Sequence, residues 1–145
     1  MTRGDLIDFV KGHATQNDFV ILPDLDNQIS LSPQRVRWLC DRRQGIGADG
    51  ILRVVRSRDV EEFRAMAGRA EFAMDYWNAD GSLAEICGNG ARLFVRYLVE
   101  AVTSGRVVEA IGTRGGVVGV QQRSSGEIAL DMGPAHEISG FAKLE

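Results

Sequence analysis

The sequence is poor in histidine, cysteine and proline, and the first two shortages exclude classes of site. Its 145 residues include two histidines, two cysteines and three prolines. His13 and His136 lie far apart without companion ligands, so we expect no metal site. Cys40 and Cys87 lie in unlike contexts, which does not suggest a disulfide framework. The sequence therefore favours a cytoplasmic protein with reduced thiols.

Long apolar runs and an excess of positive charge are also absent. No run approaches the ~18 apolar residues that cross a membrane, and the start of the chain lacks a signal-peptide pattern. With 17 basic and 20 acidic residues, the net charge of −3 predicts neither a nucleic-acid nor a membrane partner. The length suits a single domain with one hydrophobic core, which we expect to cover residues 1–145.

Hydrophobic periodicity predicts an α+β fold. Ser32-Pro33 is typical of a helix start, with serine as the cap and proline in the first turn, and this helix should end near residues 42–43. Residues 91–102 keep helical spacing and are apolar on most sides, which predicts a covered central helix ended by Gly105. We expect a curved, mostly antiparallel sheet to pack on that helix. The predicted strands are residues 6–10, 19–22, 51–55, 72–77, 107–111, 117–122 and 128–132.

A glycine-rich run at residues 45–50 matches the dinucleotide-binding pattern G-x-G-x-x-G letter for letter. That pattern binds a pyrophosphate only where it follows a strand and opens a helix. Here a predicted helix precedes the run and a predicted strand follows it. We therefore interpret the run as a tight turn that needs positive φ angles.

The segment with the clearest chemistry is Cys87 followed by Gly88-Asn89-Gly90, at the start of the central helix. A helix N-terminus stabilises a thiolate, and its unpaired N–H groups bind carboxylates. A thiolate base beside a bound carboxylate can remove the proton α to that carboxylate, which points to an amino-acid epimerase. The structural alternative is a small apolar residue buried at a helix start.

Other candidate residues are weighed in the same way. Cys40 falls on the apolar face of the first helix, which predicts a place in the core. His13 stands in a predicted polar turn, where a histidine usually bonds to the backbone. Asn17 and Asn78 also lie in predicted turns, where an amide can satisfy its own backbone or can orient an amino acid's ammonium and carboxylate groups. Both interpretations of these two asparagines stay open.

Four segments, in order, resemble the diaminopimelate epimerase family, the pyridoxal-independent enzymes of the bacterial route to lysine and peptidoglycan. The run Thr15-Gln16-Asn17-Asp18-Phe19 is similar to actinobacterial members. The matching segments are residues 11–20, 40–50, 74–82 and 87–92.

The resemblance implies a protein of two similar domains, each with a barrel-like sheet wrapped around a central helix. This chain covers the first domain, and the C-terminal domain would be its missing partner. It also implies no cofactor and two thiols on opposite faces of the α-carbon, which convert LL- to meso-diaminopimelate. Cys87 is the only one of these thiols in this chain, so we expect the isolated chain to be inactive. Whether the protein forms a homodimer stays open. The implied contacts to this small amino-acid substrate are Asn17, Asn78, Gly88 and Asn89.

The sequence departs from the family pattern at two positions. Ala14 stands where members commonly have glycine, which predicts strain in the turn before Asn17. Gly50 stands where some members have glutamine near the substrate. Two other functions stay open: a related cofactor-independent amino-acid racemase, and a non-catalytic amino-acid-binding or interaction domain. Relatives of proline racemase usually have histidine at the position of Asn89, which argues against that branch.

Overall fold

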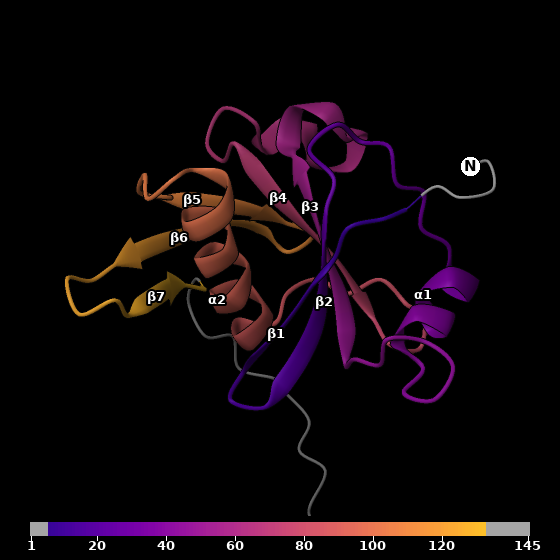
Figure 1. Cartoon of the computed structure of the whole chain (residues 1–145). Coiled ribbons are helices and arrows are strands. Elements are labelled where there is room, and N and C mark those ends of the chain that lie inside the picture. Colours follow the sequence, from indigo (N-terminus) through magenta and orange to yellow (C-terminus); the bar gives the residue numbers. More distant parts are fainter. Residues whose placement is uncertain (1–5, 133–145) are drawn as a thin grey trace, which may run out of the picture.

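The computed structural model describes residues 6–132, which form one seven-stranded sheet with helices on both of its faces (Figure 1). His136 lies outside the described residues. The α-helices are α1 (Pro33–Cys40) and α2 (Gly88–Tyr97), with 3₁₀ segments η1 (Ser57–Asp59) and η2 (Glu61–Met66) and a π-helical segment η3 (Leu98–Val102). The strands are β1 (Val10–Ala14), β2 (Asn17–Pro23), β3 (Gly50–Arg56), β4 (Phe72–Asn78), β5 (Ala110–Thr113), β6 (Gly116–Gln122) and β7 (Ile128–Asp131).

The strands lie in the sheet in the order of the sequence, from β1 to β7. Four of the six neighbouring pairs are antiparallel, and β2–β3 and β4–β5 are parallel. A parallel pair needs a long crossover connection, and α1 and α2 lie in these two crossovers. The predicted mostly antiparallel sheet is confirmed, although the two crossovers make it a mixed sheet.

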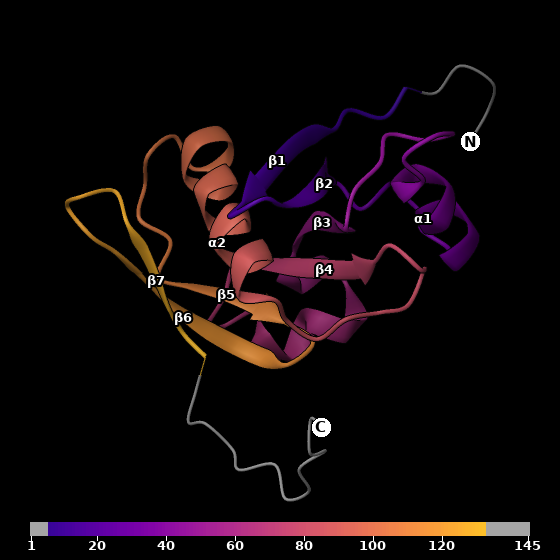
Figure 2. The same ribbon diagram turned by 90° about the horizontal axis from the view of Figure 1, so that it is seen from below.

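The sheet curls around α2, which contacts both edge strands, β1 and β7 (Figure 2). The main core fills this concave face, and its fully buried residues from the helical segment are Ala91, Phe94, Val95 and Leu98. The predicted covered central helix is therefore confirmed. Its end is π-helical, and Gly105 then takes a φ of +90° and donates its N–H to the Val99 carbonyl.

The middle strands are buried on both faces. Successive side chains of a strand point to opposite faces, and on β3 Leu52 and Val54 belong to the core around α2. Ile51 instead packs in the cluster that includes α1, and Val55 packs with Phe63 of η2. The apolar run of β3 is thus explained by two covered faces, as in other strands with helices on each side.

The first strand is not where the sequence predicts it. β1 covers Val10–Ala14 rather than residues 6–10, because it pairs with β2 from Val10↔Ile21 to Ala14↔Asn17. The sequence of β1 is polar because much of this edge strand is exposed, and this polarity resembles a turn. The turn itself consists of Thr15 and Gln16, with φ angles of 50° and 68°.

Three further boundaries differ from the prediction by at least two residues. β2 begins at Asn17 rather than Phe19, so Asn17 lies in a strand and not in the predicted turn. β5 begins at Ala110 rather than Val107, since its pairing with β6 begins at Ala110↔Gly119. α1 ends at Cys40, before the predicted end at residues 42–43. Its start agrees with the sequence, because the Ser32 hydroxyl accepts a hydrogen bond from the Arg35 N–H at 3.2 Å.

Candidate active site

Four chain segments meet where the ends of three middle strands lie side by side. They are the starts of β2 and β3, the end of β4 and the start of α2. Gly50 pairs in register with Phe19 on one side and with Asn78 on the other, so these strand ends lie side by side. The first turn of α2 approaches them at Gly90, where an added Cβ would lie 3.3 Å from the Phe19 ring. Glycine at this position therefore lets the helix begin directly over the strand ends.

Cys87 is the N-cap residue of α2, and its half-buried side chain makes no capping bond. Its Sγ donates to Asn17 Oδ1 at 3.6 Å, and Asn89 Nδ2 donates to the same oxygen at 3.5 Å. The first backbone bond of the helix runs from the Ala91 N–H to the Cys87 carbonyl. The N–H groups of Gly88, Asn89 and Gly90 precede this bond and belong to the set that a helix leaves unpaired. The structure thus brings Cys87, Asn17, Gly88 and Asn89 together.

Asn78 lies at the same strand ends, but its side-chain amide forms a hydrogen bond within the following turn. Its Nδ2 donates to Ser82 Oγ at 3.0 Å, and its backbone N–H donates to the Ser82 carbonyl at 2.8 Å. The turn interpretation therefore describes the bonds of this side chain. The Oδ1 of Asn78 accepts no hydrogen bond from another described residue, so no such bond would compete with a ligand.

The glycine-rich run forms the predicted tight turn between α1 and β3, with Gly47 at a φ of +83°. The N–H groups of Ile46 and Gly47 both donate to the Leu39 carbonyl, and that of Ala48 donates to the Cys40 carbonyl. These bonds satisfy carbonyls at the end of α1 and leave these N–H groups unavailable for a phosphate. The structure supports the rejection of a dinucleotide site here.

An ion-pair cluster beside Asn17 was not anticipated from the sequence. Asp18 accepts two hydrogen bonds from the Arg42 guanidinium, at 2.8 and 3.0 Å, and pairs with Lys11 at 2.7 Å. Arg42 also reaches Asp49 at 3.2 Å. The Arg42 and Lys11 charges hold the pKa of Asp18 well below its usual range. The available signal was Asp49, the one acidic residue inside the glycine-rich run.

Tyr76 is a second residue that sequence reasoning missed. Its buried ring packs edge-to-face on Phe19, with ring centroids 5.9 Å apart. Burial and the hydrogen-bonded Cys87 side chain raise the pKa of Tyr76 to about 12, so its hydroxyl stays protonated near neutral pH. The alternation of β4 places Tyr76 on the face that carries Met74 in the core around α2, and this pattern could have identified it.

Cys40 has the opposite surroundings to Cys87. It is 5% exposed and packs with Val36 and Ile51, as the sequence predicts for a core residue. Burial raises the pKa of the Cys40 thiol to about 11. His13 bonds to the backbone as predicted, since its Nδ1 accepts a hydrogen bond from the Gln16 N–H at 3.4 Å. It lies on strand β1, however, and not in the predicted turn.

The two departures from the family pattern have distinct structural outcomes. Ala14 itself lies in β1, and the positive φ angles fall on Thr15 and Gln16. At Gly50, an added Cβ would lie only 2.6 Å from the Trp77 carbonyl oxygen. The backbone at this position therefore requires glycine, and a glutamine would need the neighbouring strand to move.

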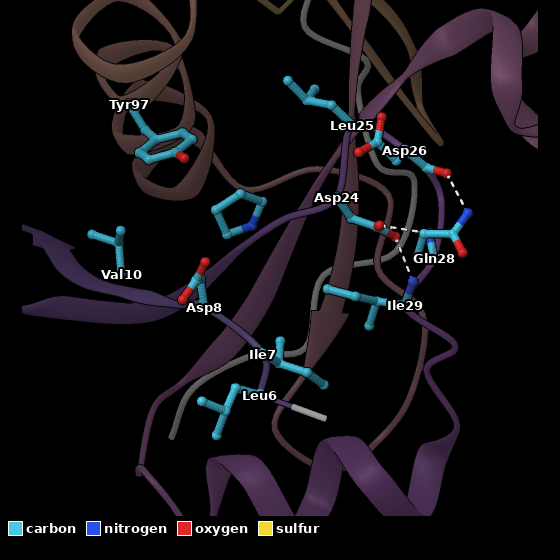
Figure 3. A pocket seen from close by; sticks show the side chains of 11 residues that line it. Leu6, Ile7, Asp8, Val10, Asp24, Leu25, Asp26, Gln28, Ile29 and Tyr97 are labelled. Carbon is cyan, nitrogen blue, oxygen red and sulfur yellow. Dashed lines mark hydrogen bonds between the residues drawn. The ribbon is translucent and has the colours of Figure 1, made fainter. Parts of the chain in front are cut away.

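A hollow of about 1110 Å³ is lined by none of the candidate site residues. Figure 3 shows Asp24, Asp26 and Tyr97 among its side chains. The Asp24 carboxylate accepts from the N–H groups of Gln28 and Ile29, at 2.7 and 3.0 Å, and so stabilises the adjoining loop. Residues 6–132 contain no group of three or more potential metal ligands and no helix able to cross a membrane.

The fold defines a class of domain in which a curled mixed sheet surrounds a central helix, and solved PhzF proteins share it. A PhzC/PhzF phenazine biosynthesis protein from Clostridium difficile (strain 630) superposes with a TM-score of 0.57 at 11% identity, covering 82% of this chain and 41% of that one. A PhzF family protein from Bacillus anthracis gives 0.51 at 16% identity, covering 86% and 38%. At these identities the likeness shows the fold alone.

Sequence comparison then identifies the family. Residues 9–138 match the family model for diaminopimelate epimerase. The diaminopimelate epimerase of Thermobifida fusca is 51% identical over 141 residues, which cover 94% of this chain and 52% of the relative. That of Streptomyces coelicolor is 53% identical over 131 residues, covering 89% and 45%. The chain belongs to the diaminopimelate epimerase family, and it spans about half the length of these relatives.

Proposed function

We propose that this chain is the N-terminal catalytic half of a diaminopimelate epimerase, an isomerase that converts LL- to meso-diaminopimelate. The observation that carries the proposal is the Cys87 thiol at the start of α2, 3.6 Å from Asn17 Oδ1 and next to unpaired N–H groups. Relatives of this name at about 50% identity support the substrate. The second domain, with the opposing thiol, would be the partner of this chain.

The chemistry is a proton transfer with no net change in atoms. The substrate carboxylate binds the N–H groups of Gly88 and Asn89, and in one direction of the reaction the Cys87 thiolate takes the proton from the α-carbon. The electron pair of the broken C–H bond moves into the carboxylate, whose developing charge these N–H groups stabilise. A thiol of the second domain then donates its proton to the opposite face of the α-carbon. In the reverse direction Cys87 is the acid.

The other proposed contacts orient the substrate. Asn17 and Asn89 lie within hydrogen-bond reach of each other beside the thiol, which suits them to the ammonium and carboxylate of one amino-acid centre. Asn78 Oδ1 is suited to a donor group at the edge of the same site. Removing one well-placed donor to the developing charge typically lowers the rate roughly 10²–10³-fold.

The proposal is tested by substrate choice in a reconstituted enzyme. We expect this chain, combined with the remaining part of the Thermobifida fusca relative, to convert LL- to meso-diaminopimelate in an assay by chiral chromatography. Proline and glutamate, tested in parallel, should not be inverted. Inversion of proline or glutamate instead would favour the related racemase, and an assembled but inactive complex would favour a binding domain.

A further inference from the structure

Asn17 is held by a charged group whose chemistry fixes the direction of its amide. Its Nδ2 donates to Asp49 Oδ2 at 2.7 Å, and the Asp18 backbone N–H donates to the same oxygen at 3.1 Å. An ionised carboxylate only accepts hydrogen bonds, so the amide atom that faces it must be the nitrogen. Asn17 Oδ1 is therefore the atom turned toward Cys87 and Asn89.

The neighbouring amide is fixed from its other end by a group of opposite charge. The Arg92 guanidinium, which only donates, bonds to Asn89 Oδ1. Asn89 therefore turns its Nδ2 toward Asn17 Oδ1. Asp49 and Arg92 thus lie at the two ends of one hydrogen-bonded series, and together they exclude the flipped orientation of both amides.

We propose that Asp49 is a positioning residue that makes Asn17 an ammonium acceptor in the site. The inference rests on the proposed function, and it assigns the ammonium and the carboxylate of one amino-acid centre to different residues. Asn17 Oδ1 faces the thiol and accepts from the ammonium of the bound amino acid, while the Asn89 NH₂ group donates to its carboxylate. With Asn17 reversed, its NH₂ group would face the ammonium, and two donors would oppose each other.

The loop before β3 keeps Asp49 in place independently of its carboxylate. The Asp49 N–H donates to the Asp18 carbonyl at 2.9 Å, and the Ala79 N–H donates to the Asp49 carbonyl at 3.1 Å. The Asp49 side chain is 46% exposed, so its removal creates no cavity in the core. Asp49→Ala therefore removes the carboxylate while these backbone bonds hold the loop. Asp59→Ala, at an exposed residue of η1, is the matched control.

The amide direction can be measured by NMR on the isotopically labelled 145-residue chain. We expect a strong nuclear Overhauser effect between the Asn17 side-chain NH₂ and the Asp18 backbone N–H, because both donate to one oxygen. Asp49→Ala should weaken it and bring the Asn17 NH₂ protons closer to the Cys87 β-protons, whereas Asp59→Ala should change neither. Absence of the effect in the parent chain, or its survival in Asp49→Ala, would overturn the proposal.

The ammonium assignment needs a ligand comparison. LL-diaminopimelate and pimelate share both carboxylates, and only the former carries ammonium groups. In NMR shift titrations we expect the parent chain and Asp59→Ala to prefer diaminopimelate. Asp49→Ala should reduce this preference about 10-fold, as expected for the loss of one hydrogen bond to a charged group. An unchanged preference in Asp49→Ala would overturn the assignment. Failure of the epimerase assay alone would overturn the proposed function. It would not affect the direction of the Asn17 amide, which the NMR measurement tests separately.

Discussion

The two cysteines of this chain differ in their exposure and in their surroundings. Cys87 is half-buried at a helix N-terminus, whereas Cys40 is 5% exposed in an apolar cluster that raises its pKa to about 11. Since the thiolate is the reactive form, we expect iodoacetamide at neutral pH to label Cys87 well before Cys40. Peptide mass mapping after limited alkylation measures this order. Equal labelling of the folded protein, or faster labelling of Cys40, would contradict the assignment.

Asp18 links the surroundings of Asn17 to pH. Its pKa is lowered from an ordinary 3.8 by Arg42 and then Lys11, so the folded state holds its proton less tightly than the unfolded chain. The resulting stabilisation is complete above the pH where the unfolded carboxyl titrates, and it is lost as the pH falls through the lower folded pKa. We expect the free energy of unfolding of Asp18→Asn, measured by urea denaturation, to fall less steeply than that of the parent as the pH drops below about 4. Asp59→Asn is the control, and an acid profile for Asp18→Asn identical to that of the parent would contradict the prediction.

The turn between β1 and β2 places two non-glycine residues in backbone conformations that their side chains disfavour. Thr15 and Gln16 both have positive φ angles, which the primed hairpin turns need and which a β-branched residue rarely adopts. Such strain costs on the order of 1–3 kcal/mol at a residue. We expect the double change Thr15→Asn with Gln16→Gly to raise the free energy of unfolding by about 1 kcal/mol, measured by urea denaturation. A decrease would show that the two residues make native contacts that outweigh the strain.

Local signals in the sequence predicted the elements whose own residues determine them. The cap at Ser32, the periodicity of the central helix and the turn between β6 and β7 are of this kind. β1 was misplaced because its polar residues are fixed by pairing with β2 rather than by their own pattern. β2 follows β1 after only Thr15 and Gln16, but the periodicity within β1 alone does not show this pairing.

The candidate site divides in the same way. Cys87 and Asn89 are neighbours in one short segment whose helix-start chemistry is visible in the sequence. Asp49 and Tyr76 reach the site only through the strand pairings that bring β2, β3 and β4 together. Their contributions were missed because they depend on tertiary contacts.

A buried charge network connects segments that are distant in the sequence. Arg53 bonds to Asp24 at 2.6 Å and to Asp75 at 2.7 Å, and Arg114 connects Asp75 to Glu62. Removing one partner leaves uncompensated buried charge, which typically costs about 3–5 kcal/mol. We expect Arg53→Leu to lower the free energy of unfolding by this amount in urea denaturation.

Arg56 on the same strand provides the matched control, because it forms a more exposed pair with Glu71 at 3.3 Å. Arg56→Leu should cost about 1 kcal/mol or less, as is usual for exposed ion pairs. Equal losses in the two variants would show that the buried network does not contribute more than a surface pair.

The complete molecule, with both halves of the site, allows the most direct test of Cys87 as an acid–base residue. We expect the chain combined with the remaining part of the Thermobifida fusca relative to incorporate solvent deuterium at the α-carbon of diaminopimelate in D₂O, measured by mass spectrometry. Cys40→Ala should retain this incorporation when folded, and the isolated chain should show no epimerisation. Cys87→Ala should abolish the formation of deuterium-labelled meso-diaminopimelate from the LL isomer, separated by chiral chromatography, in a folded, assembled protein. Near-normal formation of the labelled meso isomer by that variant would contradict the account.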